Sequence, residues 1–387
     1  MPAPITPLLD LDLLLTDAER ATADRVAALA TGWRASIAGW FANSDAPVRG
    51  IAADLGSAGL LGMSLPAPFG AGAGAVEYGM ACLEVEAVDS GLRSLLSVQG
   101  SLAMHAIHAF GSPDQAERWL PGMARGEVVG GFALTEPSVG SNPAECRTTA
   151  TRTADGWLLH GAKKWITNGP VGDVVVTWAL TDEGMRGFVV PVDAQGVTMQ
   201  EVPERLSLRA SSCGEMTLEG VALADEYRLP GARGVKAPLS CLNEARFGII
   251  FGTLGAARDS LLAALDYTVG REQFGKPLAG FQLVQAELAD MAAELAAAFS
   301  LAVHLGRIKD AGRITPAQVS LGKRTSAATA LSIARRARAL HGANGVLLEH
   351  PPMRHAANLE SVVTYEGTHE MHTLVLGQEL TGVAAFR

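Results

Sequence analysis

The spacing of apolar residues changes twice along the chain, and this change limits the folds that the sequence can adopt. From about residue 16 to residue 130, apolar residues recur at helical spacing, as in residues 76–86 and 95–110. A capping box at Thr16–Glu19 precedes the first helical stretch. From residue 131 to residue 235, short β-type runs alternate with turn residues, which predicts a small all-β module.

Long helical patterns return after this module. Residues 243–271, 281–311 and 315–340 are each long enough for a helix of a bundle. Helices, then strands, then helices indicate a segregated α+β fold. We expect an N-terminal helical domain (1–130), a middle β-barrel domain (131–235) and a C-terminal four-helix domain (236–387).

Composition excludes several functions. The formal net charge is -9, so a basic footprint for nucleic acid is absent. Only 18% of residues are charged while 48% are hydrophobic, which favours an oligomer with large interfaces. Residues 1–15 lack the basic segment of a signal peptide, and no uninterrupted apolar run is expected to span a membrane.

The cysteines argue against a metal site. The four cysteines form no CxxC pair, and no His stands near them at ligand spacing, so no metal is predicted. Reduced structural thiols fit a cytoplasmic protein best.

Two runs near the β module have the composition of a binding site. Residues 134–142 (LTEPSVGSN) combine hydroxyls with Gly and Pro, so their backbone N–H groups can approach an anionic ligand closely. The alternative is an ordinary junction loop. In residues 163–168 (KKWITN), strand alternation places Trp165 and Thr167 on one face, where a flat ring and a hydroxyl suit a flavin or nucleotide. The alternative is a tryptophan in the barrel core.

Three runs in the helical C-terminal third are also candidates. Residues 271–275 (REQFG) stand at a helix end, where Arg271 can bind a phosphate or remain solvated. Residues 341–345 (HGANG) end another helix, and their backbone either contacts a cofactor or only terminates that helix. In residues 364–369 (TYEGTH), Glu366 directly before Gly367 can reach a planar reactant and act as a general base if it is desolvated. The alternative is a solvated surface Glu.

These runs resemble, together and in this order, the signatures of the acyl-CoA dehydrogenases. The resemblance covers nearly the whole chain, and the three zones agree with the fold of that family. Within it, the chain is most similar to the glutaryl-CoA dehydrogenases, through residues 86–94, 207–211, 241–246 and 354–360.

The resemblance implies FAD as the cofactor and Glu366 as the base that removes the α-proton of an acyl-CoA. The FAD-binding residues it implies within one subunit are Phe132, Leu134, Thr135, Gly140, Ser141, Trp165, Ile166 and Thr167, with Thr368 and Glu370 on the adenosine side. Those it implies from a neighbouring subunit of a homotetramer are Arg271, Phe274, Gln282, Ala339, Leu340, His341, Gly342 and Ala343.

The resemblance also implies the substrate site: Glu86, Arg93, Ser94, Ser141, Asn243, Arg246 and Gly367. An arginine in an apolar pocket supplies the countercharge for a dicarboxylyl thioester, with Ser94 as a second donor. A plain fatty acyl chain would leave that arginine buried and unpaired, at a cost of several kcal/mol in order of magnitude. The alternative is that Arg93 pairs with Glu86 or Asp89 and meets no ligand.

The expected reaction is oxidation of glutaryl-CoA with release of CO2, followed by electron transfer to an electron-transfer flavoprotein. A non-decarboxylating or differently specific acyl-CoA dehydrogenase, and an oxidase on the same fold, remain open. A helical binding or scaffold protein without cofactor is the alternative from another class. The sequence also leaves open whether CoA or an acyl-carrier protein bears the acyl group.

Overall fold

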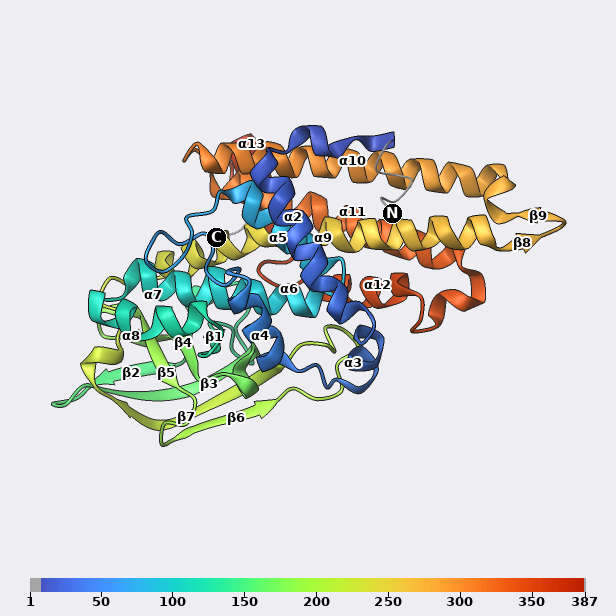
Figure 1. Ribbon diagram of the computed structural model, residues 1–387. Helices are drawn as coiled ribbons and strands as arrows, with labels where there is room; N and C mark the ends of the chain where they lie inside the picture. The colour runs from blue at the N-terminus through green and yellow to red at the C-terminus, as the bar shows by residue number, and fades with distance from the viewer. Residues whose placement is uncertain (1–7, 386–387) are drawn as a thin grey trace.

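The computed structural model describes residues 8–385, and three regions follow one another along the chain (Figure 1). A cluster of helices comes first, a β-sheet packs beneath it, and a bundle of long helices crosses above. Residues 1–7, part of the segment from which the absence of a signal peptide is expected, lie outside the described residues. The α+β architecture predicted from the sequence is confirmed.

The first region is helical. Its elements are η1 (Leu11–Leu14), α2 (Asp17–Arg34), α3 (Ile37–Asn43), α4 (Val48–Ser57), α5 (Ala75–Glu86), α6 (Ser90–Ser97), the π-helical segment η2 (Val98–Met104), α7 (His105–Phe110) and α8 (Pro113–Ala124). The predicted capping box is present, because Thr16 Oγ1 accepts from the Glu19 N–H while Glu19 accepts from the Thr16 N–H. The cap therefore sets the start of α2.

The middle region is one sheet. Among residues 8–385 its seven strands are β1 (Gly130–Ala133), β2 (Thr149–Arg152), β3 (Trp157–Thr167), β4 (Val174–Thr181), β5 (Gly184–Pro191), β6 (Val197–Glu201) and β7 (Cys213–Leu223). The strand order is β1-β4-β2-β3-β7-β6, and β5 pairs with β4. Strand β1 pairs with β4 in parallel, from Gly130 opposite Val174 to Ala133 opposite Thr177.

The C-terminal region is a bundle of three long helices and two shorter ones. They are α9 (Lys236–Gly270), α10 (Gln282–Asp310), α11 (Pro316–Leu340), α12 (Pro351–Val362) and α13 (His369–Thr381). The predicted ends of α10 and α11 and the predicted C-terminal end of α9 agree with these bounds within one residue, whereas α9 begins seven residues before the predicted start. Between α9 and α10, the two-residue strands β8 (Glu272–Gln273) and β9 (Lys276–Pro277) form a hairpin that projects from the bundle (Figure 1).

Two helices, α9 and α10, are long and apolar enough to cross a membrane by length and composition alone. Charged residues interrupt their apolar runs, such as Arg258 and Asp259 in α9 and Glu294 in α10. In α9 the most apolar window is 72% buried inside the fold, and in α10 the corresponding share is 44%. Both helices pack within the bundle, so their apolarity is that of core helices.

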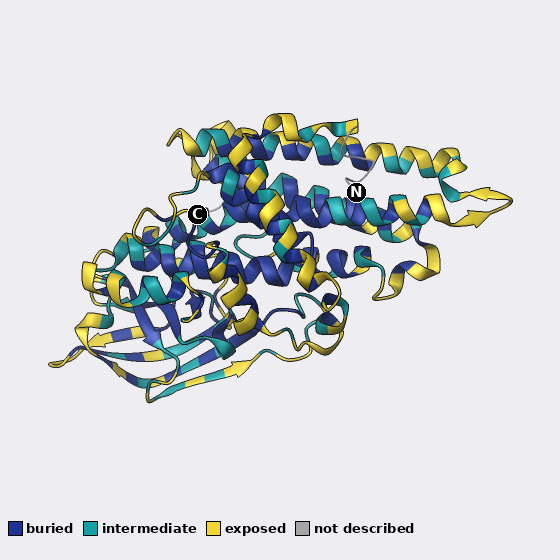
Figure 2. Cartoon of the chain, viewed as in Figure 1, coloured by how far each residue is buried: buried dark blue, intermediate teal, exposed yellow. Residues whose placement is uncertain are grey.

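Helix α5 separates two hydrophobic cores. Val76, Met80 and Leu83 pack into the core of the C-terminal bundle. Tyr78 and Val85, on the other side of the helix, belong to the core shared by the first region and the sheet. Figure 2 shows this concentration of buried residues where α5, α6 and α9 meet. The C-terminal end of α5 therefore lies at the junction of all three regions.

A buried ion pair fixes the loop that leaves β1. Glu136 Oε1 accepts from Lys163 Nζ at 2.9 Å, from the Thr148 N–H at 2.9 Å and from Thr148 Oγ1 at 2.7 Å. Lys163 also donates to the Leu134 carbonyl at 3.2 Å. Burial raises the pKa of Glu136, but Lys163 and Thr148 outweigh it and hold that pKa at about 2. The pair ties β3 to the loop at residues 134–136.

We predict that Glu136→Gln lowers the free energy of unfolding by about 3–5 kcal/mol, because it leaves the Lys163 charge buried without its partner. The pKa of Glu136 is lower in the folded protein than the ordinary carboxyl value of 4.5, so the ionised carboxylate stabilises the fold fully only above about pH 4.5. This stabilisation is lost as pH falls from about 4.5 towards 2. Equilibrium denaturation across this pH range measures both effects. The control is Glu127→Gln, whose exposed pair with Arg125 contributes little. Equal stability of both variants at neutral pH would contradict the prediction.

Candidate active site

Glu366 lies in the turn between α12 and α13, and its carboxylate is buried. Oε2 is inaccessible to solvent and has no hydrogen-bond partner among the described residues. Burial raises the pKa of Glu366, whereas the charges of Arg93, Arg246 and Lys323 lower it. The expectation of a solvated surface Glu is therefore wrong: the group has the desolvation that a general base requires.

The turn has an unusual backbone. Glu366 has φ 53° and Gly367 has φ 96°, so two consecutive residues adopt positive φ. A Cβ on Gly367 would lie 2.9 Å from His372 Nε2 and 3.4 Å from Arg246 Nη2. Both the backbone and the space around it therefore require glycine after the carboxylate.

Arg93 lies beside this turn and is 1% exposed. Its Nε donates to Glu86 Oε2 at 2.6 Å, and its Nη2 donates to the Tyr365 hydroxyl. Burial raises the pKa of Tyr365 to about 12, so its hydroxyl is neutral at pH 7. Among residues 8–385, no acceptor bonds Arg93 Nη1, and Glu86 Oε1 also lacks a partner. The Arg93 guanidinium thus pairs with Glu86, which was one of the alternatives considered from the sequence. Its Nη1 is still available as a hydrogen-bond donor.

The pairing of Arg93 with Asp89 does not occur. Asp89 caps α6 through the Gly91 N–H at 2.8 Å, and its other oxygen accepts from Arg354 at 3.1 Å and from Asn358 at 2.9 Å. These contacts join α6 to α12. They fix the helix that carries Arg93 and Ser94 against the helix that leads into the Glu366 turn. Ser94, 3% exposed, donates to the carbonyl of residue 90 at 2.8 Å.

Helix α9 contributes Asn243 and Arg246. Arg246 Nε donates to the Glu366 carbonyl at 2.7 Å, and its Nη1 donates to Asn243 Oδ1 at 3.0 Å. The structure therefore brings Glu86, Arg93, Ser94, Asn243, Arg246, Glu366 and Gly367 into one cluster, which is built from α5, α6, α9 and the turn before α13.

Trp165 lies at a bulge near the end of β3. The pairing of β3 with β7 shifts register between Lys163 and Ile166, and Trp165 has φ 63°. The indole is 55% exposed while Ile166 is buried, so the alternative of a barrel-core tryptophan is wrong. A bulge that turns a large aromatic ring outward leaves it able to pack on a planar ligand.

The loop after β1 lies beside Trp165. The Lys164 N–H donates to the Thr135 carbonyl at 2.9 Å, so residues 134–135 run alongside the end of β3. Phe132 and Leu134 are buried, Thr135 is half-buried, and Gly140 and Ser141 are exposed. The loop at residues 134–135 and the end of β3 at residues 164–167 therefore lie side by side.

A second set of predicted cofactor residues lies at the far end of the bundle. Phe274, 94% exposed with φ 54°, stands at the tip of the β8–β9 hairpin. His341 is buried and stacks on Tyr267 at 4.5 Å between ring centroids, and Asn344 donates to the Tyr267 hydroxyl at 3.1 Å. These contacts place the end of α11 beside the end of α9. The exposed members of this set are Arg271, Phe274, Gln282, Ala339, Gly342 and Ala343, and Leu340 is half-buried.

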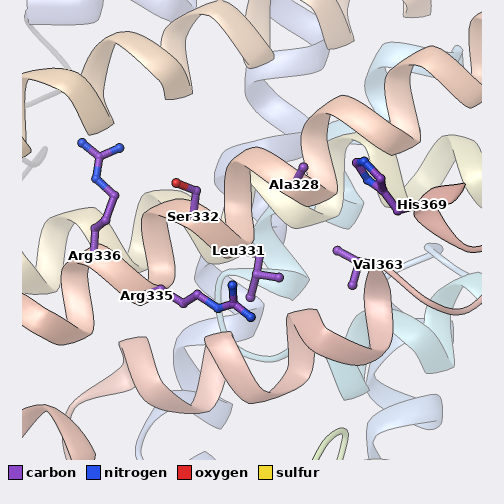
Figure 3. A pocket seen from close by; sticks show the side chains of 7 residues that line it. All are labelled: Ala328, Leu331, Ser332, Arg335, Arg336, Val363 and His369. Carbon is purple, nitrogen blue, oxygen red and sulfur yellow. The ribbon is translucent and has the colours of Figure 1, made fainter. Parts of the chain in front are cut away.

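An open groove of about 480 Å³ lies between α11, α12 and the start of α13 (Figure 3). Its lining includes Arg335 and Arg336 from α11 and His369 from α13. Arg335 pairs with Glu360, and Arg336 pairs with Glu287 and Glu294, so neither guanidinium is free to bind an anion. Next to the groove, Thr368 caps α13 through the Met371 N–H at 3.2 Å, and Glu370 is exposed in its first turn.

Three residues around Glu366 were not predicted as site residues: Tyr365, Lys323 and His372. Tyr365 directly precedes Glu366, but an aromatic residue next to a turn can have many roles, so its place in the sequence does not mark it as a site residue. Lys323 lies in α11 and His372 lies in α13, two helices whose polar residues would ordinarily be expected to face solvent. No sequence signal shows that these two residues are buried.

The chain matches three family descriptions that together span most of its length. They are "Acyl-CoA dehydrogenase, N-terminal domain" over residues 16–127, the middle domain over residues 131–221 and the C-terminal domain over residues 232–381. Their order agrees with the three structural regions. The fold and the site thus define an acyl-CoA dehydrogenase architecture.

Individual proteins agree with this assignment. The chain is 33% identical to an acyl-CoA dehydrogenase of Bacillus subtilis, covering 85% of this chain and 88% of that protein. A solved glutaryl-CoA dehydrogenase from Mycobacterium smegmatis superimposes with a TM-score of 0.98 at 56% identity, with 99% of each chain covered. A second, in complex with FADH2, gives 0.98 at 51% identity over 100% of each. The chain belongs to the acyl-CoA dehydrogenase family and is an FAD-dependent enzyme.

The small residue at position 252 of α9 makes room for the buried ion pair. A Cβ there would lie 2.2 Å from Glu86 Oε2 and 3.2 Å from Arg93 Cδ. We predict that Gly252→Ala displaces the pair, lowers the free energy of unfolding by about 1–3 kcal/mol, and slows flavin reduction by acyl-CoA. The matched control is Gly32→Ala in α2, where a Cβ meets nothing within 4 Å. Denaturation and rapid-mixing kinetics test both effects, and unchanged values for Gly252→Ala would show that the pair tolerates the added carbon.

Proposed function

We propose that the protein oxidises glutaryl-CoA and releases CO2 to give crotonyl-CoA, with Glu366 as the catalytic base. The observation that carries this proposal is the buried Arg93 guanidinium beside the Glu366 turn, whose Nη1 has no acceptor among the residues that the structure describes. A buried arginine with a free donor suits a carboxylate at the far end of the acyl chain. The similarity to solved glutaryl-CoA dehydrogenases supports the same substrate.

The charge balance of the cluster favours an anionic acyl group. Arg93, Arg246 and Lys323 lie near Glu366, and Glu86 pairs with Arg93. Two guanidiniums and the Lys323 amine, whose pKa is lowered by burial to about 7, therefore lie near two carboxylates. A carboxylate on the acyl group would accept from the Arg93 guanidinium, whereas an uncharged acyl tail would leave that donor without an acceptor.

The residues of the sheet edge fit an FAD. The bulge exposes the Trp165 ring for packing, and the loop at residues 134–135 presents backbone groups beside it. In this proposal Phe132, Leu134, Thr135, Gly140, Ser141, Ile166 and Thr167 hold the flavin and pyrophosphate, and Thr368 and Glu370 the adenosine side. FAD supplies the hydride acceptor when it is bound.

A second copy of the chain completes the cofactor site in this proposal. Arg246 lies within α9, and Arg271 directly follows the last residue of this helix. The 25 positions between the two arginines correspond to about 37 Å of helix. Arg271 is therefore remote from the Glu366 turn of its own chain. Phe274, at the tip of the hairpin, is also fully available to a second chain, since its side chain is 94% exposed. We infer that Arg271, Phe274, Gln282 and residues 339–343 meet the FAD of a neighbouring subunit, within a homotetramer.

The chemistry of the substrate follows from these contacts. The Glu366 backbone N–H polarises the thioester carbonyl, which makes the α-proton more acidic. Glu366 takes that proton as hydride leaves the β-carbon, which forms the α,β double bond. The bond between the γ-carbon and the distal carboxylate then breaks, CO2 leaves, and the electron pair moves into the conjugated thioester. Protonation at the γ-carbon gives crotonyl-CoA. The two electrons pass to an electron-transfer flavoprotein in this proposal.

We expect Glu366→Gln to bind FAD and glutaryl-CoA but to lose at least about 10³-fold in the rate of flavin reduction, because the amide cannot accept the α-proton. Anaerobic stopped-flow absorbance measures this rate. Near wild-type reduction by the variant would mean that another group is the base.

We expect flavin reduction to slow as pH falls, with an inflection above the ordinary carboxyl value of 4.5. Burial raises the pKa of Glu366, so its reactive anionic form is lost at a higher pH than in an exposed Glu. The pH profile of flavin reduction tests this. An inflection at or below 4.5 would contradict a desolvated base.

The substrate is tested by anaerobic titration of the flavin-loaded protein with glutaryl-CoA, with CO2 measured in parallel. We expect bleaching with one CO2 per flavin, and we expect Arg93→Met to lose at least about tenfold more rate with glutaryl-CoA than with butyryl-CoA. Bleaching without CO2 would indicate a non-decarboxylating dehydrogenase. Rapid peroxide formation in air would indicate an oxidase.

A further inference from the structure

The backbone that carries Glu366 is strained and needs support. Glu366 itself has φ 53°, and a non-glycine residue in the left-handed region costs about 1–2 kcal/mol. Such a conformation persists only where the surrounding structure holds it. The contacts that hold this turn therefore decide where the carboxylate lies.

Two cations on different helices hold the carbonyls of the turn. Lys323 Nζ, from α11, donates to the Gly367 carbonyl at 2.8 Å and to the Val363 carbonyl at 3.3 Å. Arg246, from α9, donates to the Glu366 carbonyl that lies between them in sequence. The turn is thus bound from both sides through its backbone, and the Glu366 carboxylate remains free.

Lys323 is costly to bury. It is 1% exposed, and among the described residues its ammonium donates to two backbone carbonyls and to no carboxylate. Burial lowers its pKa to about 7; Glu366 and Glu370 raise that pKa, and Arg246 and Arg93 lower it. A methionine of similar volume would avoid this desolvation, so packing alone gives no reason for an amine at this position.

The groups around Lys323 come from several elements. Glu366, Glu370 and His372 face it from the turn and α13, and Arg246 and Arg93 face it from α9 and α6. Burial and the neighbouring cations lower the pKa of His372 to about 3, so His372 is neutral at pH 7. Ser320, one turn before Lys323, bonds His372 Nδ1 at 3.0 Å. Two consecutive turns of α11 therefore support the segment after Glu366.

We propose that Lys323 is a positioning residue, which holds the Glu366–Gly367 turn in its left-handed conformation and favours the ionised form of the Glu366 carboxylate. This inference rests on the proposed role of Glu366 as the base. Lys323 acts through the backbone and the field at the carboxylate, without contact to the acyl group.

Lys323→Met tests the proposal in the flavin-loaded full chain. The substitution removes two hydrogen bonds to carbonyls and one amine near the carboxylate. We therefore expect the rate of flavin reduction by glutaryl-CoA at pH 7 to fall about tenfold to a hundredfold. We also expect the acid limb of the pH profile to move up by roughly one unit, since the lost charge lowers the pKa of Glu366. Part of the lost rate therefore returns at higher pH, which a purely structural defect would not produce. The dissociation constant of crotonyl-CoA should change less than threefold.

The matched control is Arg324→Met, one position along α11. Arg324 also tethers α11 to α13, through Thr373 Oγ1 at 2.8 Å, but on the exposed side. We expect its rate and pH profile to equal those of the wild type. Lys323→Arg keeps the charge and should restore the position of the acid limb even if its rate is reduced.

Outcomes separate this inference from the proposed function. If Lys323→Met reduces flavin at the wild-type rate with an unshifted profile while Glu366→Gln is inactive, the positioning role is wrong and the base assignment stands. If Glu366→Gln remains active, the base assignment itself fails. Should Lys323→Met lose its flavin or fail to fold, Lys323→Gln, which keeps an N–H donor without charge, carries the same expectation for the acid limb.

Discussion

The proposed role of Glu366 as the base depends on a buried carboxylate that can still ionise. Burial raises the pKa of Glu366 and favours its protonated form, whereas solvent exposure would make it a weaker base. Arg93, Arg246 and Lys323 oppose the desolvation from three helices. None of them forms a hydrogen bond to the carboxylate among the described residues, so it stays ionisable without losing its freedom to reach a substrate proton.

The three regions of the fold meet where this balance is needed. Helix α5 lies between two hydrophobic cores and ends at Glu86. The Asp89 cap links α6 to α12, and α9 supplies Arg246 and the small residue that admits the Glu86–Arg93 pair. The cluster around Glu366 therefore combines side chains of the first region with side chains of the C-terminal region. The sheet then adds its edge, with Trp165 turned outward by a bulge.

Sequence periodicity was sufficient to predict the fold, but it could not predict which charged side chains are buried or which partners they have. The long helices, the β module and the Thr16 capping box follow from local patterns, which nearby residues determine. The distribution of predicted site residues into one cluster around Glu366 and another at the far end of the bundle depends on how helices pack. Sequence alone could not tell whether Arg93 pairs with Glu86 or Asp89, because both lie within a few residues of it.

Lys323 shows most clearly what sequence patterns omit. It stands among small residues in a helix, where a lysine is normally solvated. Only the fold reveals that its ammonium donates to two backbone carbonyls that lie 40 and 44 positions later in the chain. A residue that acts on backbone has no side-chain partner for a motif to record. The same holds for Gly252, whose role is the space it leaves for the Glu86–Arg93 pair. The residues that touch a reactant can thus be recognised by motif, whereas those that position them follow from packing.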